Sequence, residues 1–516
     1  MSIGNSILNM VEKAGNRLPD PVTIFLILIG IVVTVSVFAA GSGLEATHPV
    51  TGDTIAAQSL LSGENIRRLL TEYTQIFVNF PPLGLVLVVM IGAGVAERTG
   101  LFAAGLRALV GWVPATLLTA TLVFAGVMGN LAVDAGYVVL IPLGGLVFAS
   151  VGRHPIAGIA ATFAGVSAGF SANLAPGPLE PLLLGITQTA AQFIDPDWGL
   201  NILSNYFFIV ALTPAVVIAG TFVTHRIIEP RLGPWTPPGT ESDDAPEATT
   251  QLSSAENRGL LMAGLVLLAI TVTVVYLVWP SNGILWDASS EGSELTPFFN
   301  SIVAISMLTF LLAGMAYGIG AGTIKSDKDV VKMASDAMGD MGIYIVLAFS
   351  MAMFLALFAW SNLGTILAIG GAATLQESGL PAPVLLIAMV LLTAVLNLFV
   401  GSASAKWAML APVAVPMLML LGIGPDATTA AYRVGDGATN IITPLMPYMP
   451  LVLVFARRYM PEFGLGSLIA TMLPYSIAIL IVSMSVLGIF VVLDLPLGPG
   501  FAPVTIDPST LTSGSN

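Results

Sequence analysis

The chain has 516 residues, of which 56% are apolar and 9% are charged. Soluble domains carry about 25% charged residues, so this composition excludes a water-soluble globule and the single-core enzyme that would need its polar surface. The net charge of −13 argues against nucleic-acid binding, and the absence of cysteine excludes disulfides, thiolate chemistry and Cys-ligated metals. The composition is that of a polytopic membrane protein.

Nine apolar runs are long enough to cross a bilayer, which takes about 20 residues. The first is too long for a signal-peptide core and is interpreted as a retained span. Two further apolar stretches, 116–150 and 383–421, are each too long for one span and are interrupted by small and polar residues. The nine predicted spans lie near 21–41, 81–97, 156–193, 201–222, 259–279, 298–321, 341–360, 426–458 and 466–492.

Lysine and arginine predict the orientation. Lys13 and Arg17 precede the first span, so the N-terminus is placed in the cytoplasm and, after nine spans, the C-terminus outside. The remaining basic residues alternate correctly if each interrupted stretch enters and leaves on the same side, as a re-entrant hairpin, one opening inward and one outward. Non-helical backbone at that depth must be surrounded by protein or by a water-filled cavity. Arg67 and Arg68, in a loop placed outside, are the exception.

The runs group into six predicted units. The linker is polar and Pro-rich, typical of a flexible loop, and the tail is expected to be loosely ordered. The units are N-terminal spans (1–115), a first core (116–222, with hairpin 116–150 and broken helix 156–193), a cytoplasmic linker (223–258), scaffold spans (259–340), a second core (341–494, with hairpin 383–421 and broken helix 426–458) and an external tail (495–516).

Four asparagines indicate an internal repeat. Asn130 and Asn173 are 43 residues apart, as are Asn397 and Asn440, and a shift of 267 relates the pairs. Chance is the alternative for any one match. Because the charge rule places the two halves on opposite sides, the repeat is predicted to be inverted, as in secondary transporters with broken helices. Amide groups and freed backbone carbonyls can hold an ion or a carboxylate, so these four asparagines are the candidate sodium site.

Ionisable residues inside apolar spans are rare and usually functional. Asp436 lies three residues after Arg433, so a helix would place them on one face as an ion pair; a carboxylate that titrates or binds substrate is the other interpretation. Glu180 lies beside two prolines with no cation nearby in the sequence, which favours a proton carrier over a loop-facing glutamate.

Other candidates keep two interpretations each. Asp134 is a pathway residue, or else part of a solvated turn or a helix cap, and Lys406 attracts an anion or extends to the surface. Trp407 stacks a ring or anchors at the interface, while Ser402 and Ser404 line a cavity or bond their own backbone.

Four motifs stand out along the chain: Val11-Glu-Lys-Ala-Gly-Asn-Arg-Leu-Pro-Asp-Pro-Val-Thr, Ala168-Gly-Phe-Ser-Ala-Asn-Leu, Gly401-Ser-Ala-Ser-Ala-Lys-Trp407 and Tyr432-Arg-Val-Gly-Asp-Gly-Ala-Thr-Asn-Ile-Ile-Thr-Pro444. They resemble the AbgT family of transporters, and the resemblance covers about residues 10–495. It implies a homodimer of nine-span subunits with two re-entrant hairpins, in the bacterial cytoplasmic (inner) membrane, with dimerisation assigned to the scaffold spans. It also implies uptake of p-aminobenzoyl-glutamate or export of sulfonamide antimetabolites, driven by an ion gradient.

The resemblance also implies pathway residues and partners. The expected ligands are a small anionic aromatic substrate and a proton or sodium as coupling ion, with no other cofactor. Glu180 stands where the family usually has Asp. A sodium-coupled dicarboxylate carrier is the alternative, and a passive channel and an intramembrane enzyme are disfavoured by the repeat and by the lack of a nucleophile–base pair. The implied pathway positions are Asn397, Ser404, Trp407, Pro425, Asp436 and Pro444.

Overall fold

The computed structural model describes residues 19, 21–47, 52–111, 114, 116–132, 136–235, 252–279, 283–287, 294–443, 446, 448–499 and 504–511. Two predicted site residues, Asp134 and Pro444, lie outside these described residues, as does the middle of the predicted linker, residues 236–251.

The N-terminal region contains helices and one small hairpin. Strand β1 pairs antiparallel with β2, with Ala46 opposite Ile55. Ser62 caps α3 by accepting a hydrogen bond from Asn65, and Gly100, at φ 91°, ends α4 in the left-handed conformation that favours glycine. The elements are α2 (Pro21–Gly41), β1 (Glu45–Thr47), β2 (Thr54–Ala56), α3 (Gly63–Val78), α4 (Pro81–Thr99) and α5 (Leu101–Gly111).

The first core begins with a helical pair broken at Asn130 and continues with a second broken helix. Pro176 and Pro178 lie in the segment between the two parts of that helix and cannot donate backbone hydrogen bonds. The elements are α6 (Leu118–Gly129), η1 (Asn130–Ala132), η2 (Gly136–Leu140), α7 (Ile141–Ser150), α8 (Pro155–Ser167), η3 (Ala168–Ser171), α9 (Leu179–Ala191), α10 (Tyr206–Val223), η4 (Thr224–Ile228) and α11 (Glu229–Leu232).

The scaffold region and the second core complete the chain. The second core has the same order as the first: a helical pair interrupted at an asparagine, then a helix that ends in a 3-10 turn. This turn precedes Asn173 in the first core and begins at Asn440 in the second. The elements are α12 (Ser254–Leu277), α13 (Thr296–Ala321), α14 (Asp327–Asp340), α15 (Gly342–Trp360), α16 (Leu363–Glu377), α17 (Ala382–Asn397), α18 (Ala403–Met419), α19 (Pro425–Thr439), η5 (Asn440–Ile442), α20 (Met449–Arg457), α21 (Leu465–Val492) and η6 (Pro508–Thr510).

The repeat is visible in hydrogen bonds as well as in sequence. Asn130 Nδ2 donates to the Gly169 carbonyl over 3.4 Å, and Asn397 Nδ2 donates to the Asp436 carbonyl over 2.7 Å. Both bonds join residues 39 apart and are related by the same shift of 267. The inverted orientation of the halves stays a prediction.

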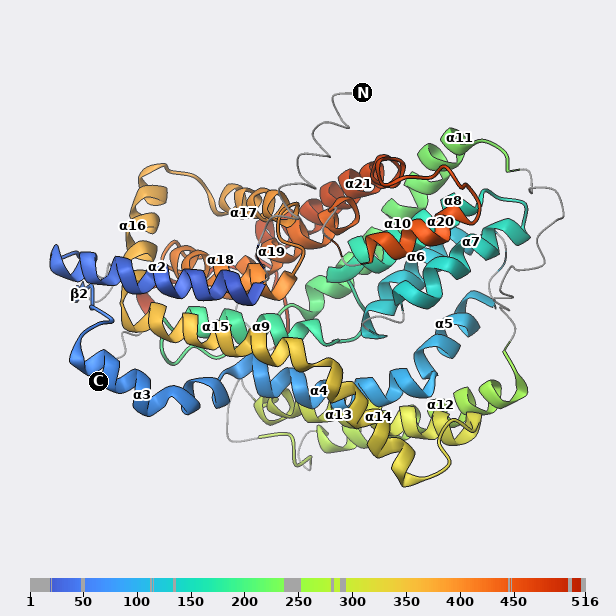
Figure 1. Cartoon of the computed structure of the whole chain (residues 1–516), viewed down its shortest axis with the longest axis horizontal. Coiled ribbons are helices and arrows are strands. Elements are labelled where there is room, and N and C mark those ends of the chain that lie inside the picture. The colour runs from blue at the N-terminus through green and yellow to red at the C-terminus, as the bar shows by residue number, and fades with distance from the viewer. Residues whose placement is uncertain are drawn as a thin grey trace.

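The predicted membrane architecture is confirmed at the level of a helical, multi-span protein. Among the described residues, seven helices are long and apolar enough to cross a membrane. In Figure 1, α4, α9 and α15 run along the long axis, with α3 and α16 at one end and α5 and α11 at the other. The count of nine spans and the re-entrant path of the hairpins stay predictions.

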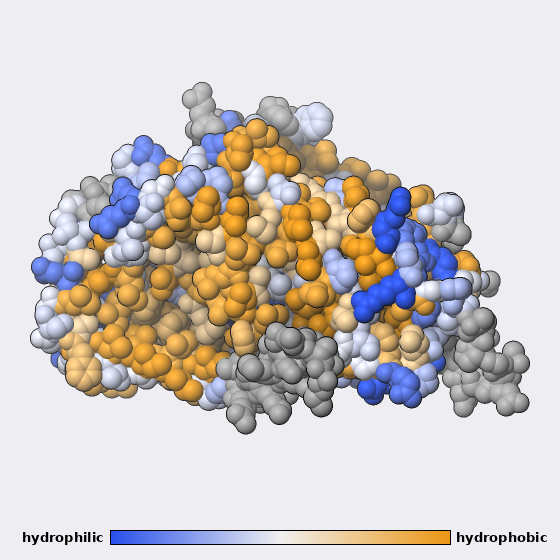
Figure 2. Space-filling view, turned by 90° about the horizontal axis from the view of Figure 1, so that it is seen from above, coloured by the Kyte–Doolittle hydropathy of each residue, from blue (hydrophilic) through white to orange (hydrophobic). Residues whose placement is uncertain are grey.

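The outer surface matches a hydrocarbon environment. Figure 2 shows a broad apolar surface across the middle of the molecule, with hydrophilic residues concentrated toward its two ends. Large apolar side chains of α17 and α21 contribute exposed area, among them Val395, Ile477 and Ile481. Such an extent of exposed apolar surface indicates contact with lipid.

The expectation of a loosely ordered tail is wrong for its described parts. The Leu497 carbonyl accepts from Phe208 N–H, and the Val504 carbonyl accepts from Gly424 N–H. Leu497, Val504 and Leu511 are buried. Polar composition suggested a free tail, but these few apolar residues bury enough surface to bind it to α10 and α19.

Candidate functional site

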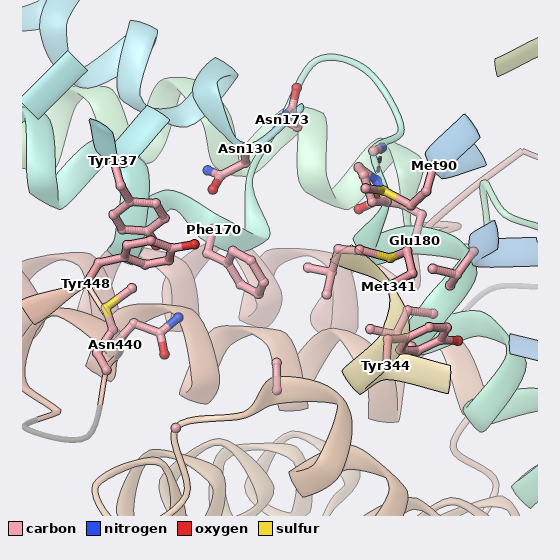
Figure 3. Close-up of a pocket in the computed structure, with 18 residues that line it drawn as sticks. Met90, Asn130, Tyr137, Phe170, Asn173, Glu180, Met341, Tyr344, Asn440 and Tyr448 are labelled. Atoms are coloured by element: carbon pink, nitrogen blue, oxygen red, sulfur yellow. Dashed lines mark hydrogen bonds between the residues drawn. The ribbon is translucent and has the colours of Figure 1, made fainter. Parts of the chain in front are cut away.

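A cavity of about 340 Å³ lies where the breaks of the two cores meet (Figure 3). Three of the four predicted asparagines, Asn130, Asn173 and Asn440, line it together with Glu180. The predicted site residues that the structure describes therefore converge on one region, although not all of them face the cavity.

The break in the first core presents its polar groups through local hydrogen bonds. Asn173 Oδ1 accepts from Leu174 N–H over 2.9 Å and from Ala175 N–H over 3.2 Å, which satisfies backbone donors that the interrupted helix leaves open. Glu180 Oε2 accepts from Gly177 N–H over 2.5 Å at the start of α9. The carboxylate is thereby held at the helix N-terminus, where the helix dipole favours negative charge.

Glu180 also has a cation, contrary to the prediction from its sequence neighbours. Arg433 Nη2 on α19 lies 2.6 Å from Glu180 Oε1, and both side chains are buried. The partners are 253 residues apart, so no local pattern could reveal the pair. Glu180 is a paired carboxylate in this conformation.

Asp436 is paired as well, but with Lys406 rather than with Arg433. Lys406 Nζ lies 2.5 Å from Asp436 Oδ1, and the two side chains are 0% and 2% exposed. The predicted Arg433–Asp436 ion pair is therefore wrong: α19 directs these two charges to different helices, Arg433 to α9 of the first core and Asp436 to α18 of the second. The four charges balance, as burial in a low-dielectric environment requires.

Lys406 follows neither of its predicted interpretations. Its ammonium donates to Asn397 Oδ1 and, over 3.1 Å, to the Val400 carbonyl. With Asp436 these contacts occupy all three N–H donors, so the side chain neither extends to the surface nor offers a free charge to an anion.

Trp407 is fully buried and is not an interfacial anchor. Its Nε1 donates to Thr187 Oγ1 over 2.9 Å, and its ring lies 4.4 Å from that of Tyr432 between centroids. Trp407 thus packs α18 against α9 and α19, behind the cavity wall.

The serines and Pro425 act at helix starts. Ser402 caps α18 by accepting from Ala405 N–H, and Ser404 lies 3.3 Å from it between hydroxyl oxygens. Pro425 occupies the first turn of α19, where its missing N–H costs nothing.

The four asparagines form two connected pairs. Asn397 Nδ2 donates to Asn440 Oδ1 over 2.8 Å, and Asn130 and Asn173 both donate to the Val127 carbonyl. Among the described residues no group of three or more His, Cys, Asp or Glu is placed to hold a metal. Amide and backbone oxygens, which suit a monovalent ion, are the donors that the breaks offer.

The aromatic walls of the cavity were missed in the sequence. Tyr137 and Tyr448 stack with centroids 4.0 Å apart and an interplanar angle of 12°, and Phe170 and Tyr344 lie on other sides of the space (Figure 3). The repeat offered one signal for Tyr137, because the shift of 267 relates it to Ser404, which was already a predicted pathway residue. Flat rings around a carboxylate and three amides suit an aromatic ligand with polar substituents.

Comparisons with known proteins agree with this architecture. The model of the "AbgT putative transporter family" matches residues 6–505. The chain is 34% identical to the p-aminobenzoyl-glutamate transport protein of Escherichia coli (strain K12) over 502 residues, covering 97% of this chain and 98% of that protein.

Two solved transporters have the same fold. The YdaH transporter of Alcanivorax borkumensis superposes with a TM-score of 0.88 at 44% identity, covering 93% of this chain and 100% of that one. MtrF of Neisseria gonorrhoeae, described as one of a class of antimetabolite efflux pumps, superposes with a TM-score of 0.90 at 41% identity, covering 96% and 100%. The chain therefore belongs to the AbgT family and is a multi-pass membrane transporter rather than an enzyme.

Proposed function

We propose that this transporter couples an ion gradient to the movement of p-aminobenzoyl-glutamate-like compounds, sulfonamide antimetabolites, or both. The observation that carries the proposal is the cavity of about 340 Å³, which combines stacked tyrosines with a buried Glu180–Arg433 pair at the meeting point of two broken helices. The relationship to a p-aminobenzoyl-glutamate transport protein and to an antimetabolite efflux pump supports the same substrate class.

The aromatic part of the substrate would lie between the rings of the cavity. Its carboxylate or sulfonyl group would approach Arg433, whose Nε has no hydrogen-bond partner among the described residues. Glu180 separates Arg433 from the cavity, since Glu180 lines the space and Arg433 does not. A proton on Glu180 would weaken the pair and free the guanidinium for the substrate anion, so proton and anion would bind together.

Sodium is the second proposed coupling ion. Asn130, Asn173 and Asn440 place amide groups on the cavity wall, and Asn130 Nδ2 donates to the Gly169 carbonyl in the second broken helix of the first core. We expect Asn130→Ala and Asn173→Ala to weaken sodium-dependent substrate binding and to leave the fold intact. Normal sodium-dependent binding by both variants would remove sodium from the proposal.

The decisive experiment separates the two gradients. Purified protein in liposomes would be given a proton gradient or a sodium gradient, and accumulation of p-aminobenzoyl-glutamate would be measured beside equilibrium binding. Glu180→Gln should lose proton-driven accumulation and retain binding, because the amide accepts no proton but still leaves Arg433 available. Glu180→Asp, the matched control, keeps the carboxylate and should retain coupling.

Two results would contradict this assignment. Proton-driven accumulation by Glu180→Gln at the wild-type level would exclude Glu180 as carrier. A sodium-coupled dicarboxylate carrier, which the asparagine-rich breaks in both halves also favour, would be supported if succinate displaced p-aminobenzoyl-glutamate and were itself accumulated.

We propose further that the protein acts in the bacterial cytoplasmic membrane as a homodimer joined through α12. That helix leaves Leu261, Leu265 and Leu268 each about 60% exposed along one stretch, a face that a second copy would cover. A cysteine at Leu265 should cross-link to its counterpart in membranes. A cysteine at Ile481, on the exposed face of α21, is the control that should not.

A further inference from the structure

The ammonium of Lys406 is enclosed by oxygen atoms from three separate segments. Asp436 Oδ1 of α19 lies 2.5 Å away, the Val400 carbonyl of the break before α18 lies 3.1 Å away, and Asn397 Oδ1 at the end of α17 accepts a third hydrogen bond. Lys406 and Asn397 are both 0% exposed. We call these three oxygens the Lys406 cage.

Such an arrangement is how proteins hold a dehydrated monovalent cation. Carbonyl and carboxylate oxygens from a broken helix replace the water molecules of the ion. The asparagine is oriented for this purpose, because its Nδ2 donates to the Asp436 carbonyl and to Asn440 Oδ1, which leaves Oδ1 directed at the ammonium.

The first core has the same framework without the charges. The shift of 267 relates Asn397 to Asn130, Lys406 to Val139 and Asp436 to Gly169. The amide–carbonyl bond is present in both halves, but the lysine and the aspartate are both absent from the first. The second core therefore has both the ammonium and its carboxylate, and the first core has neither at the equivalent positions.

We propose that the Lys406 cage is a monovalent-cation site whose ion is supplied by the chain itself, as a tethered ammonium. The first core retains the equivalent break beside the cavity for a mobile ion, and the second is permanently filled. The mobile ion of the first core rests on the proposed function, whereas the Lys406 cage rests on the contacts of Lys406 alone and is tested independently of the substrate.

Removing the side chain should convert the cage into a site for a free cation. Lys406→Ala deletes the ammonium and opens space, and it leaves the buried Asp436 without a partner, which is costly unless a cation enters. The full-length variant would be purified in ammonium chloride and exchanged into sodium, potassium or choline chloride at equal ionic strength, and its melting temperature followed against salt concentration. A saturable rise with ammonium, sodium or potassium beyond that of the wild type is expected, and none with choline, since binding to the folded state alone raises stability.

The double variant Lys406→Ala/Asp436→Asn is the matched control. It removes the counter-charge of the cage, so its response to small cations should return to that of the wild type. An equal response to choline and sodium in Lys406→Ala, or an undiminished response in the double variant, overturns the proposal. The proposal is also overturned if none of the tested salts allows Lys406→Ala to fold while the double variant does fold, because the cage would then accept only its own lysine.

Discussion

At the scale of single residues, the charges of α19 connect the two cores. Arg433 reaches back to Glu180 of the first core, and Asp436, one turn later, reaches Lys406 of the second. α19 therefore cannot move relative to α9 or α18 without lengthening an ion pair. Binding of a proton or an ion that neutralises one residue of either pair would therefore affect the position of α19.

The observed pairing can be tested by double-mutant cycles on protein stability. We expect coupling energies of about 1–3 kcal/mol for Glu180 with Arg433 and for Lys406 with Asp436, and a smaller value for Arg433 with Asp436. Each single neutralisation should cost about 3–5 kcal/mol, because it leaves a buried charge unpaired. The opposite ranking, with Arg433 and Asp436 coupled most strongly, would restore the local ion pair that the spacing suggested.

His154 predicts a pH dependence outside the membrane-spanning segments. Its side chain accepts from Ile156 N–H and caps α8, and burial lowers its pKa from the ordinary 6.5. The unfolded chain therefore takes up a proton first as pH falls below about 6.5, and the contribution of His154 to stability, complete above that value, decreases.

The non-titrating cap His154→Asn isolates this effect. The stability of this variant, measured by thermal unfolding in detergent, should decrease less than that of the wild type between about pH 6.5 and 5. The reason is that asparagine caps a helix without binding a proton. Parallel pH profiles for the two proteins would show that His154 contributes nothing to the slope.

Four of the six charged residues that are buried in the described part of the chain could be predicted from the sequence, but Asp195 and Asp426 were missed, and no partner was predicted correctly. Ionisable residues inside apolar runs identified Glu180, Lys406, Arg433 and Asp436 directly. The spacing of three residues suggested a local pair, yet the structure joins residues 253 and 30 apart, because tertiary packing decides which face of α19 meets which helix. The aromatic walls were hidden for the same reason, since tyrosines and phenylalanines in apolar runs resemble ordinary packing residues.

At the scale of elements, close helix crossings depend on glycine. Gly435 lies where α19 crosses α17, and an added Cβ would come 2.3 Å from the Val390 carbonyl. Neither backbone can move aside easily, since both helices pack against α21 as well.

A pair of alanine substitutions should therefore have opposite effects. Gly435→Ala is expected to destabilise the protein by about 1–3 kcal/mol through overpacking. Gly370→Ala on α16, where a Cβ meets nothing within 4 Å, should be neutral or stabilising by up to about 1 kcal/mol, because glycine is unfavourable inside a helix. Chemical or thermal unfolding of both variants measures the difference, and equal effects would mean that the crossing can relax.

Helix interruptions were easier to predict than complete helices. Gly, Asn and Pro placed the breaks near 130, 173 and 397, where the structure has them, because these residues stop a helix by local chemistry. Helix α16 and the amphipathic α3 were missed, since neither is an apolar run long enough to count as a span. A search for long apolar runs finds helices that span the lipid, but it misses helices that are short or amphipathic.

At the scale of the whole molecule, the predicted orientation can be measured directly. The chain has no cysteine, so single cysteines report position without background. With an external C-terminus, a cysteine at the exposed Thr510 should react with an impermeant reagent added to intact cells, and one at the exposed Lys328 should react only after the cells are opened. The reverse pattern would contradict both the span count and the side assigned to each end.

The packed C-terminal segment gives a further whole-molecule prediction. A Cβ on Gly498 would come 2.0 Å from the Leu203 carbonyl, so Gly498→Ala should displace the segment and break its contact with Phe208 N–H. We expect a lower melting temperature, whereas Gly488→Ala, which meets nothing within 4 Å, should leave it unchanged. An unchanged value for both variants would indicate that the segment adds little to stability.

The balance of the four buried charges has an electrical consequence. Glu180, Arg433, Asp436 and Lys406 sum to zero, so shifting them together through the membrane potential requires no net electrical work. An unbalanced group of four would instead cost about 2.3 kcal/mol per elementary charge for every 100 mV. These four side chains therefore add no net charge movement of their own, and the charge moved per transported molecule, after subtraction of the charge of the cargo, gives the charge carried by the coupling ions.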